Sequence, residues 1–343
     1  MLETITIEQA GKWDSIVKSM HSYDFYHLSA YHRLDTSGQA VLLHIQTEKT
    51  NFALPVLFRN VEGTDYKDIT SVYGYAGPLA SQTNPAQEDI RRFQNELKAY
   101  CDTHKIISVF ARLHPLFENQ SEWLDDLGNV NNSNLTVAID LTLPEKEQRK
   151  QYARSLKYRI NALKRKNVQI IQASNKQETD TFIDIYRETM DRVNASPQYY
   201  FSNEYFYRFL TEIDSCLYLA VYNNQIISGS LCTFSGNGIM QAHLNATRSA
   251  CLPISPLKLV LDEARLDGIK RGMLRLHLGG GKGGSDDSLF IFKSRFSHLH
   301  FQFKTWRYVH NPQAYNRMLR NQFGENIPQT DFFPLYRLNT NRI

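Results

Sequence analysis

The sequence predicts an α/β protein made of two consecutive modules, each with a mixed, mainly antiparallel sheet flanked by helices. Three observations support this class. The chain has 343 residues, about two domains of usual size. Its composition, 42% hydrophobic and 22% charged, is that of a globular rather than a disordered chain. Strand-like and helix-like stretches also follow one another in an order that occurs twice.

The first half of the chain supplies the first round of elements. Short apolar runs predict strands, and apolar positions spaced three and four apart predict helices. A polar turn joins two of the strands into a pair. The predicted strands are residues 3–7, 41–46, 51–58, 106–112 and 135–140, and the predicted helices are residues 8–20 and 86–103.

The second half repeats the order: strand, two helices, three antiparallel strands, helix, strand, helix, strand. Asn223 and Asn224 favour the positive φ of a hairpin turn. Ser202 is a predicted N-cap, and Ser255 followed by Pro256 predicts the N-cap and first position of another helix. The predicted strands are residues 168–172, 217–222, 225–234, 239–246, 273–278 and 299–309, and the predicted helices are residues 176–193, 202–213, 255–270 and 287–296.

The boundary between the modules is expected within LTLPEKE, residues 141–147, where apolar periodicity is lost and Pro144 occurs. This gives a first module of residues 1–145 and a second of residues 146–343. Neither a run of 18 apolar residues nor an N-terminal secretory pattern is visible, so a cytoplasmic protein without a transmembrane segment is expected. The four cysteines lack paired spacing, which fits small core residues in a reducing compartment.

A basic stretch begins the second module. Residues 149–166 hold eight Lys or Arg and no acidic residue, whereas the net charge of the whole chain is only +4. Such a stretch is either a solvated helix face or a contact for polyanions, because a cluster without counter-charges raises the local positive potential. Phosphates of tRNA and the pyrophosphate of a lipid-linked sugar would both fit. The candidate polyanion-binding residues are Arg154, Lys157, Arg159, Lys164 and Arg165.

A glycine-rich stretch, HLGGGKGGSDDS, follows the strand predicted at residues 273–278. It satisfies GxGxxG, but a dinucleotide fingerprint should open a long helix and be followed by an acidic residue about 20 positions later. Lys282 is followed by Gly283, so the stretch is not a P-loop either. The remaining interpretations are a loop that lines a site, with backbone close to a ligand at Gly279, Gly280 and Gly281, or a mobile surface loop.

Lys293 lies on an otherwise apolar helical face, with Leu289 and Phe296 at the matching positions and Phe292 beside it. It either extends its ammonium outward to solvent or holds a charge next to a ligand, where it could stabilise an oxyanion.

His243 and Asn245 are expected on one face of a strand. There they either line a cleft or have their hydrogen bonds satisfied within the sheet. His298 and His300 have no further ligand spacing, so no metal site is predicted.

Several of these motifs together resemble the Fem-type aminoacyltransferases of peptidoglycan bridge synthesis, and their relatives in polysaccharide gene clusters, which are Fem-like members of the GNAT acyltransferase superfamily. The similarity spans essentially the whole chain. It lies in the stretches HLNAT, Gly279 to Gly281, LFIFKSRFS (residues 289–297), ALPVLF (53–58), YGYAGPL (73–79) and the basic SLKYRINALKRKNVQI (155–170).

The resemblance implies two tandem GNAT-like modules and a transfer of an amino acid from aminoacyl-tRNA to an amine of a cell-wall precursor. It implies that Lys293 of the Phe-Lys pair, with Phe292, binds the reacting ester, and that Arg192 and Tyr205 hold substrate. No permanently bound cofactor is implied. The partners would be aminoacyl-tRNA and a nucleotide- or lipid-linked cell-wall or glycan precursor, with only peripheral membrane contact through the basic helix. The long helical arm that some members insert is absent from this sequence.

In the mechanism that follows, a deprotonated amine attacks the ester carbonyl, and Lys293 with backbone amides near Gly279 to Gly281 stabilises the developing charge. Asp286 and His277 are the candidate general bases, and the leaving ribose oxygen could itself accept a proton.

Two alternatives remain. One is a CoA- or carrier-dependent N-acyltransferase acting on an amino sugar of an exopolysaccharide. The loop TRSACLPISP argues against CoA, because it has no glycine and its Pro253 and Pro256 cannot donate to a pyrophosphate. The other is a non-catalytic module that binds tRNA or another polyanion through the basic helix.

Overall fold

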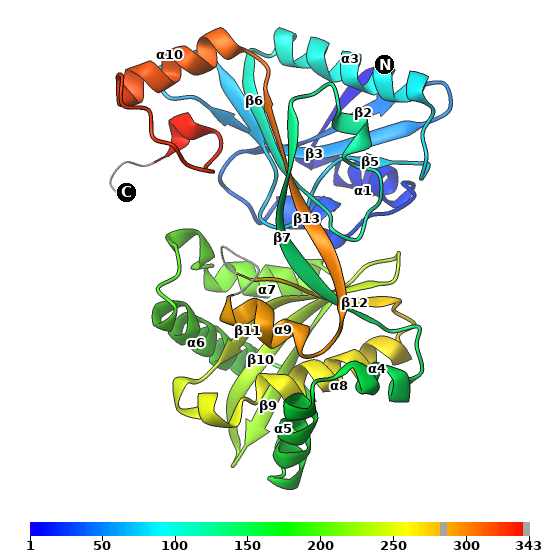
Figure 1. Ribbon diagram of the computed structural model, residues 1–343, viewed down its shortest axis with the longest axis vertical. Coiled ribbons are helices and arrows are strands. Elements are labelled where there is room, and N and C mark those ends of the chain that lie inside the picture. The colour runs from blue at the N-terminus through cyan, green and yellow to red at the C-terminus, as the bar shows by residue number, and fades with distance from the viewer. Residues whose placement is uncertain (282–286, 339–343) are drawn as a thin grey trace. The chain divides into compact units, whose positions relative to one another are not determined.

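The computed structural model describes residues 1–281 and 287–338, and it divides into two compact units. Unit 1 comprises Met1–Ser133 and Gln302–Ile343, and unit 2 comprises Asn134–Phe301. Two strands, β7 (Asn129–Asp140, green) and β13 (Leu299–Val309, orange), run from one unit into the other (Figure 1).

These units differ from the consecutive ranges 1–145 and 146–343 expected from the sequence. The boundary falls at residues 133 and 134, and the C-terminal part of the chain returns to unit 1. The physical reason is β13, which was expected to complete the second module. It pairs with β6 (Ile106–Leu113) and places the indole of Trp306, fully buried, in the core of unit 1.

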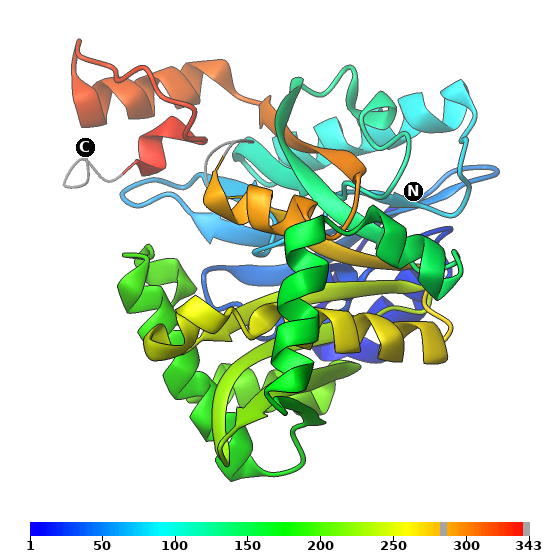
Figure 2. The same cartoon turned by 60° about the horizontal axis from the view of Figure 1, so that its bottom comes forward.

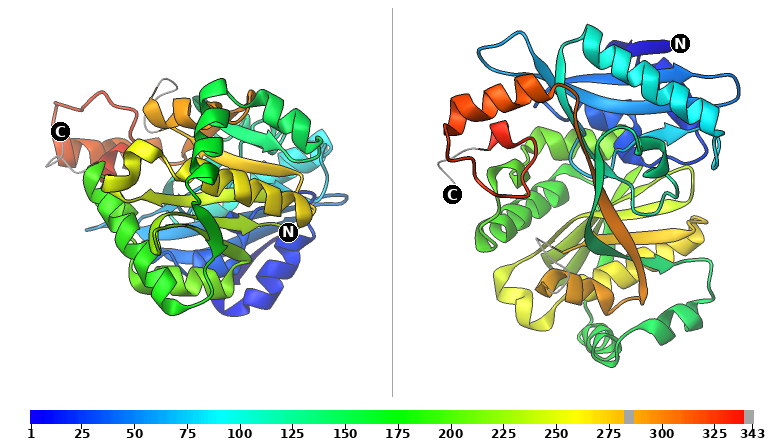
Figure 3. Two further views of the ribbon diagram at one scale, coloured as in Figure 1. Left: turned by 90° about the horizontal axis from the view of Figure 1, so that it is seen from below. Right: turned by 45° about the horizontal axis from the view of Figure 1, so that its top comes forward.

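The sheet of unit 1 has the strand order β1-β2-β3-β4-β6-β13. Neighbouring strands are antiparallel except β4 and β6, which are parallel. Helix α3 lies over one face of this sheet (Figure 3, right). The other elements of unit 1 are β1 (Leu2–Thr6), α1 (Ala10–Lys18), α2 (Ser29–His32), β2 (Gln39–Gln46), β3 (Asn51–Asn60), β4 (Lys67–Thr70), β5 (Leu79–Ala80), α3 (Gln87–Thr103) and α10 (Pro312–Phe323).

The sheet of unit 2 has the strand order β7-β12-β11-β10-β9-β8, and only β11 and β12 are parallel. Helices α6 and α7 lie on one face and α5 and α8 on the other; Figure 2 shows α5 (green) across the face that α8 covers. Its elements are α4 (Glu145–Gln151), α5 (Arg154–Arg165), β8 (Gln169–Gln172), α6 (Lys176–Arg192), α7 (Asn203–Glu212), β9 (Ser215–Tyr222), β10 (Gln225–Phe234), β11 (Ile239–Thr247), α8 (Leu257–Lys270), β12 (Arg275–Gly280) and α9 (Ser288–Ser294).

The two sheets therefore share one topology, which confirms the repeated element order. In each unit the fourth strand is parallel to the fifth, and a helix connects them: α3 in unit 1 and α8 in unit 2. In each unit the strand beside the fifth comes from a crossing segment, β13 in unit 1 and β7 in unit 2. Each sheet is therefore completed by a strand that the chain forms as it crosses from the other unit, and this exchange of final strands is part of the duplication.

Local sequence signals set most helix starts. Ser202 accepts a hydrogen bond from the amide of Tyr205 and caps α7 as predicted, and Asn175 caps α6 through the amide of Glu178. The start of α8 differs from the prediction. A 3₁₀ helix, η5 (Ser249–Ile254), comes first, Ser255 adopts a left-handed φ of 53°, and Pro256 takes the N-cap position. Pro253 and Pro256 have no amide hydrogen to donate, so the series of helical backbone hydrogen bonds is interrupted at this point.

Other segments were not predicted as elements, namely β4, β5, α2, α4 and α10. Their lengths, between two and four residues for the first three, give too few positions for a periodic pattern. None of the helices in the described ranges is long and apolar enough to cross a membrane.

Candidate functional site

The parallel strands β11 and β12 of unit 2 separate at the point where polar side chains gather. Their pairing runs only from Ile239 to Gln241 on β11 and from Arg275 to His277 on β12, although both strands continue beyond it. At the last pair, His277 Nδ1 lies 2.6 Å from Gln241 Oε1. Ligands of open α/β sheets bind where parallel strands end or part, so this divergence is a natural place for a site.

Each of the two strands carries an irregularity just after that last pair. On β11, His243 is the extra residue of a bulge opposite Leu231 and Cys232. On β12, Leu278 is the extra residue against β7, and Gly279 after it has φ of +74°, which a residue with a side chain rarely adopts. Bulges redirect side chains and are common beside active sites. Both irregularities lie just beyond the last pair of β11 and β12, where the pairing of these two strands ends.

Lys293 reaches this gap from α9. The carboxylate of Asp287 caps the helix by accepting from the amide of Phe290 at 2.7 Å, which fixes the start of the helix. Lys293 Nζ donates to the carbonyl oxygen of Gly280 at 2.6 Å. A side chain added at Gly279 would place its Cβ 3.3 Å from Nζ and 3.9 Å from Gln241 Nε2. The ammonium is therefore held between α9 and the end of β12.

The environment of Lys293 is poor in water, and this desolvation lowers the pKa of its ammonium from 10.5 to about 8. The nearby carboxylate of Asp287 raises that pKa and opposes part of the effect. Lysines with a pKa near neutrality are typical of sites where the amine or ammonium takes part in chemistry. A cation that is weakly solvated is also a strong electrostatic partner for a developing oxyanion.

Position 281 needs a glycine because the side chain of Asp287 lies close to it. A Cβ at Gly281 would come within 2.5 Å of the carboxylate atoms of Asp287. The glycine stretch thus allows close backbone approach, as expected from the sequence, but the group that approaches is a side chain of α9. Sequence reasoning named Asp286 as a candidate base, and Asp286 lies outside the described residues. Asp287 is the acidic residue that the described site contains.

His277 is fully buried, and its Nδ1 faces the oxygen assigned to the Gln241 amide. That contact assigns the proton to Nδ1, because an amide oxygen only accepts. Gln241, 3% exposed, therefore orients His277 and lies close to Gly279 as well. Sequence reasoning singled out His277 but not Gln241. The available signal was alternation, since Gln241 precedes His243 by two positions on one strand.

Tyr205 and His243 form a second polar pair on the α7 side of the sheet. The hydroxyl of Tyr205 lies 3.0 Å from His243 Nε2, and the ring of Phe209 stacks on the imidazole with 5.0 Å between centroids. Burial lowers the pKa of His243 to about 3, so the imidazole is neutral at physiological pH. The structure thus places two of the predicted substrate-binding residues together.

Asn245 and Arg192 are placed elsewhere. The bulge at His243 breaks the alternation that would put Asn245 on the same face, and Asn245 Nδ2 donates instead to the carbonyl of Ala242 at 3.5 Å. The expectation of a shared face for His243 and Asn245 was therefore wrong. The guanidinium of Arg192 donates to the carbonyl of Thr247 at 3.1 Å and to the hydroxyl of Ser249 at 2.8 Å. Arg192 therefore connects the end of α6 to the end of β11 and the residues that follow it.

The apolar face expected for α9 is also different from the prediction. Leu289 is 43% exposed, whereas Phe290 and Phe292 pack against the core together with fully buried Phe296. The helix ends at Ser294, so Phe296 is not on its face at all. Phe292 is edge-on to Phe296 with 5.7 Å between centroids. The aromatic residues anchor α9 and leave Lys293 directed to Gly280.

The basic stretch forms two helices, α4 and α5, that break at Tyr152 and Ala153. Lys164 pairs with Glu263 of α8 at 2.8 Å, and Lys150 pairs with Glu147 at 2.7 Å. Within the described ranges, no ion pair is formed by the other candidate polyanion-binding residues, Arg154, Lys157, Arg159 and Arg165. The stretch therefore keeps uncompensated positive charge, although part of it is neutralised.

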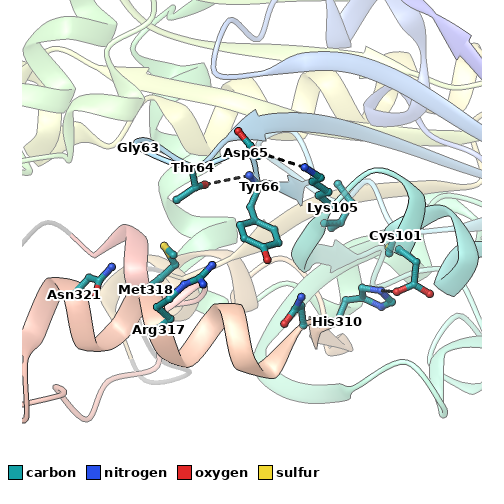
Figure 4. A pocket seen from close by; sticks show the side chains of 13 residues that line it. Gly63, Thr64, Asp65, Tyr66, Cys101, Lys105, His310, Arg317, Met318 and Asn321 are labelled. Atoms are coloured by element: carbon teal, nitrogen blue, oxygen red, sulfur yellow. Dashed lines mark hydrogen bonds and ion pairs between the residues drawn. The ribbon is translucent and has the colours of Figure 1, made fainter.

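Unit 1 has a separate groove of about 640 Å³ between the β3–β4 turn, α3 and α10 (Figure 4). His310 Nε2 pairs with Asp102 at 2.7 Å, Lys105 Nζ lies 3.4 Å from Asp65, and the guanidinium of Arg317 lies over the ring of Tyr66. Carboxylates thus face His310 and Lys105, whereas Arg317 packs on an aromatic ring. In the part of the chain that the structure describes, no cluster of three or more His, Cys, Asp or Glu residues could hold a metal ion.

No family model and no curated protein sequence matches the chain. Solved structures do match it. FemX is 13% identical, with a TM-score of 0.71 over 92% of this chain and 99% of the FemX chain. L-PGS from Bacillus licheniformis is 10% identical, with a TM-score of 0.58 over 88% of this chain and 92% of that one.

A third solved structure is a tandem GNAT protein from the clavulanic acid biosynthesis pathway. It is 9% identical, with a TM-score of 0.50 over 90% of this chain and 98% of that one. The repeated topology of units 1 and 2 agrees with these similarities, since each unit has the same strand order and the same single parallel pair. The chain has the tandem GNAT-like α/β fold that it shares with FemX.

Proposed function

We propose that the protein is an N-acyltransferase that transfers an amino acid from aminoacyl-tRNA to an amine of a cell-wall precursor. The observation that carries the proposal is the position of Lys293, whose ammonium is desolvated and lies beside Gly279 and Gly280 where the parallel strands separate. The fold shared with FemX agrees with the resemblance of this segment to Fem-type aminoacyltransferases.

The chemistry assigned to Lys293 is electrostatic. The acceptor amine attacks the ester carbonyl, and a C–N bond forms while negative charge develops on the carbonyl oxygen. One N–H of Lys293 is used by the carbonyl of Gly280, which fixes the direction of the side chain and leaves two N–H groups for the oxyanion. The C–O bond to the ribose then breaks, and the ribose oxygen takes the proton that the amine loses.

The described residues favour the ribose oxygen over His277 as the proton acceptor. His277 is fully buried and is engaged with Gln241, which suits a residue that positions the end of β12. Asp287 accepts from the amide of Phe290 and lies near Lys293, which suits a residue that orients α9 and keeps the ammonium charged. An amine and an activated ester need mainly positioning to react.

A CoA-dependent transferase is the second candidate, because one of the similar structures is a tandem GNAT protein, solved without AcCoA. The start of α8 argues against it. The amides of Lys258 and Leu259 already donate to the carbonyls of Ser255 and Pro256, at 3.2 and 2.9 Å. These two amides of the first helical turn are therefore engaged within the chain, which argues against their use as a cradle for a pyrophosphate.

The test of the proposal is a transfer assay with aminoacyl-tRNA, a muropeptide acceptor and the variant Lys293→Met. We expect transfer to fall at least a hundredfold, because one preorganised oxyanion partner is commonly worth about 10²–10³ in rate. Lys18→Met, which removes an exposed lysine of α1, is the matched control and should transfer at the wild-type rate. Wild-type turnover by Lys293→Met would refute the role of Lys293.

The donor is tested separately by fluorescence anisotropy with aminoacylated and uncharged tRNA near physiological salt. Preference for the aminoacylated form supports aminoacyl transfer. Equal binding of aminoacylated and uncharged tRNA, together with saturable binding of acetyl-CoA, would indicate that the donor is an acyl thioester instead.

A further inference from the structure

The duplication gives unit 1 its own pair of diverging parallel strands, β4 and β6. Their last paired residues are Thr70 on β4 and Phe110 on β6. Beyond this pair, the amide of Arg112 donates at 3.4 Å to the hydroxyl oxygen of Ser71 rather than to a backbone carbonyl. The two strands therefore part at Ser71. Ligands of open α/β sheets bind where parallel strands end or part, so this position in unit 1 corresponds to the site of unit 2.

A positively charged side chain stands at the divergence in each unit. On β12 of unit 2, the second residue beyond the last pair is Gly279, and its added Cβ would lie 3.3 Å from Lys293 Nζ. On β6 of unit 1, the second residue beyond the last pair is Arg112. A helix supplies the cation in unit 2, whereas the strand itself supplies it in unit 1.

Strand β13 adds two more polar residues to the same face of the sheet in unit 1. It pairs with β6 (Figure 1), with Thr305 opposite Arg112 and Arg307 opposite Phe110. Directly opposed residues of antiparallel strands project to the same face, with their Cβ atoms about 4.5–5.5 Å apart. The alternate residues of both strands belong to the core that α3 covers. The four residues therefore share the face that α3 does not cover.

The two arginines of this face are close to Phe110 and have little compensating charge. Arg112 Cζ lies 5.4 Å from the centroid of the Phe110 ring, and Arg307 is the cross-strand partner of Phe110. Among the described residues, the guanidinium of Arg112 forms neither a hydrogen bond nor an ion pair. Arg307 Nη1 lies 3.7 Å from the carboxylate of Asp331, which is fully exposed, so this pair is weak.

Two buried polar atoms of this face lack a hydrogen-bond partner within residues 1–281 and 287–338. They are Thr305 Oγ1 and Arg307 Nε, and Thr305 is only 7% exposed. Buried polar atoms normally have a partner, because leaving one unpaired costs free energy. The buried carboxylate of β4, Asp68, already accepts from Arg59 and Arg337. The face thus holds unused donors and needs an acceptor.

We propose that Arg112, Thr305 and Arg307 bind a phosphate group of a ligand, in a second site that the duplication provides. The N–H groups of a guanidinium match two phosphate oxygens at once, and the hydroxyl of Thr305 donates to a further oxygen. A phosphate group carries a charge of about −1.5 to −2 near neutral pH, which suits two arginines better than the single charge of a carboxylate. The site does not depend on the reaction assigned to Lys293.

The test is isothermal titration calorimetry of the full-length protein with inorganic phosphate, at constant ionic strength so that general screening does not change. We expect Arg112→Met to bind phosphate at least tenfold more weakly, because it loses charge-assisted hydrogen bonds. Arg91→Met, which removes an exposed arginine of α3, is the matched control and should bind phosphate as the wild type does.

Thr305→Val separates binding from a structural role. The substitution keeps the branched shape of the side chain and removes a hydroxyl that has no partner in the described structure. We expect the free variant to unfold at a higher urea concentration than the wild type and to bind phosphate about fivefold more weakly. Lower stability with unchanged phosphate binding would overturn the role of Thr305.

Other outcomes decide the site as a whole. Equal phosphate affinity of the wild type and Arg112→Met, or no saturable binding by the wild type, would overturn it. Binding of acetate that depends on Arg112, without binding of phosphate, would overturn the phosphate assignment in favour of a carboxylate.

The source of the phosphate is tested with uridine diphosphate and geranyl phosphate as probes of a nucleotide and of a lipid. The probe that loses affinity in Arg112→Met identifies the source. These titrations involve neither tRNA nor amino acid transfer, so the phosphate site and the proposed function can fail independently.

Discussion

The Lys293 ammonium can stabilise an oxyanion only while it keeps its proton. Burial lowers its pKa to about 8, so we expect the rate of transfer to lose this contribution as the pH rises above 8. Lys293→Arg keeps its charge throughout this range, because a guanidinium has a pKa above 12. The measurement is the ratio of wild-type to Lys293→Arg rates between pH 6.5 and 9.5, which cancels the deprotonation of the acceptor amine. A ratio that does not fall above pH 8 would contradict the role.

The same residue links pH to stability. The pKa of Lys293 is about 8 in the folded protein against 10.5 as a free side chain, so the unfolded chain binds more protons between these values. Burial of Lys293 therefore reduces stability at pH 7, and the reduction is relieved as the pH rises from 8 to 10.5. We expect Lys293→Met to be more stable than the wild type at pH 7 in urea, and this difference to shrink by pH 10.

Single residues of the site could be predicted where a motif marks them, and not where a contact is non-local. Lys293 and Gly279 stand in recognisable patterns, and the structure brings them together. Gln241 is 36 positions before His277 in sequence, and only the parallel pairing of β11 and β12 makes them neighbours. Asn245 was assigned the wrong face because a one-residue bulge cannot be read from alternation.

At the scale of elements, the conformation of the β12 end decides where the ammonium lies. Gly279 and Gly272 both have a positive φ, +74° and +73°. A Cβ at Gly272 would meet nothing within 4 Å, whereas a Cβ at Gly279 would lie 3.3 Å from Lys293 Nζ. We expect Gly279→Ala and Gly272→Ala to lose similar stability, about 1–2 kcal/mol from backbone strain.

Only Gly279→Ala should also lose transfer activity, because only its Cβ displaces the ammonium. The measurements are urea unfolding and the transfer rate of both variants. Equal activity of Gly279→Ala and Gly272→Ala would show that the position of Nζ beside this strand is unimportant.

Elements with a long periodic pattern were predicted well, and their ends less so. The sequence predicts β13 at residues 299–309, the range that the structure gives it, and predicts α6 and α3 within one residue at each end. The start of α8 was predicted as a simple cap, because the 3₁₀ turn of η5 depends on how two prolines end the local hydrogen-bond ladder. Which unit β13 joins depends on the strand with which it pairs, and the periodicity of its apolar residues carries no information about that partner.

Helix α2 gives unit 1 a titratable group in its core. His32 is fully buried, its Nδ1 lies 3.1 Å from the carbonyl of Leu28, and its ring lies 5.0 Å from that of Trp13. Burial lowers the pKa of His32 to about 4, from 6.5 for a free side chain. The unfolded chain therefore binds a proton that the folded chain does not between pH 6.5 and 4, and this contribution to stability is lost as the pH falls through that range.

Replacing His32 by Asn removes this titration. We expect the free energy of unfolding of His32→Asn to depend less on pH than that of the wild type, by up to about 1.4 kcal/mol per pH unit between pH 6 and 4.5. Tryptophan fluorescence is the right probe, because Trp13, Trp123 and Trp306 all belong to unit 1. Parallel pH dependences of the two proteins would show that His32 is not the titrating group.

At the scale of the whole molecule, the exchanged strands decide which parts of the chain can fold alone. A fragment of residues 1–145 contains strands β1 to β6 of unit 1 but lacks β13, so the edge of β6 from Ser108 to Leu113 loses its partner. It also lacks Trp306, a fully buried member of the core between the sheet and α3. Truncating a buried Trp typically costs about 3–5 kcal/mol, which is a large part of the stability of one domain.

Unit 1 should fold when both of its segments are present. Gln302 Nε2 donates to the carbonyl of Ser133 at 2.8 Å, so the two chain ends at the unit boundary are adjacent, and a short Gly-Ser linker can replace residues 134–301. We expect the joined chain 1–133/302–343 to show the blue-shifted emission of buried tryptophans and a cooperative urea transition, and the fragment 1–145 to show neither. Cooperative folding of the fragment 1–145 would mean that β13 is dispensable, and that the strand exchange is a connection between units rather than a structural requirement of each.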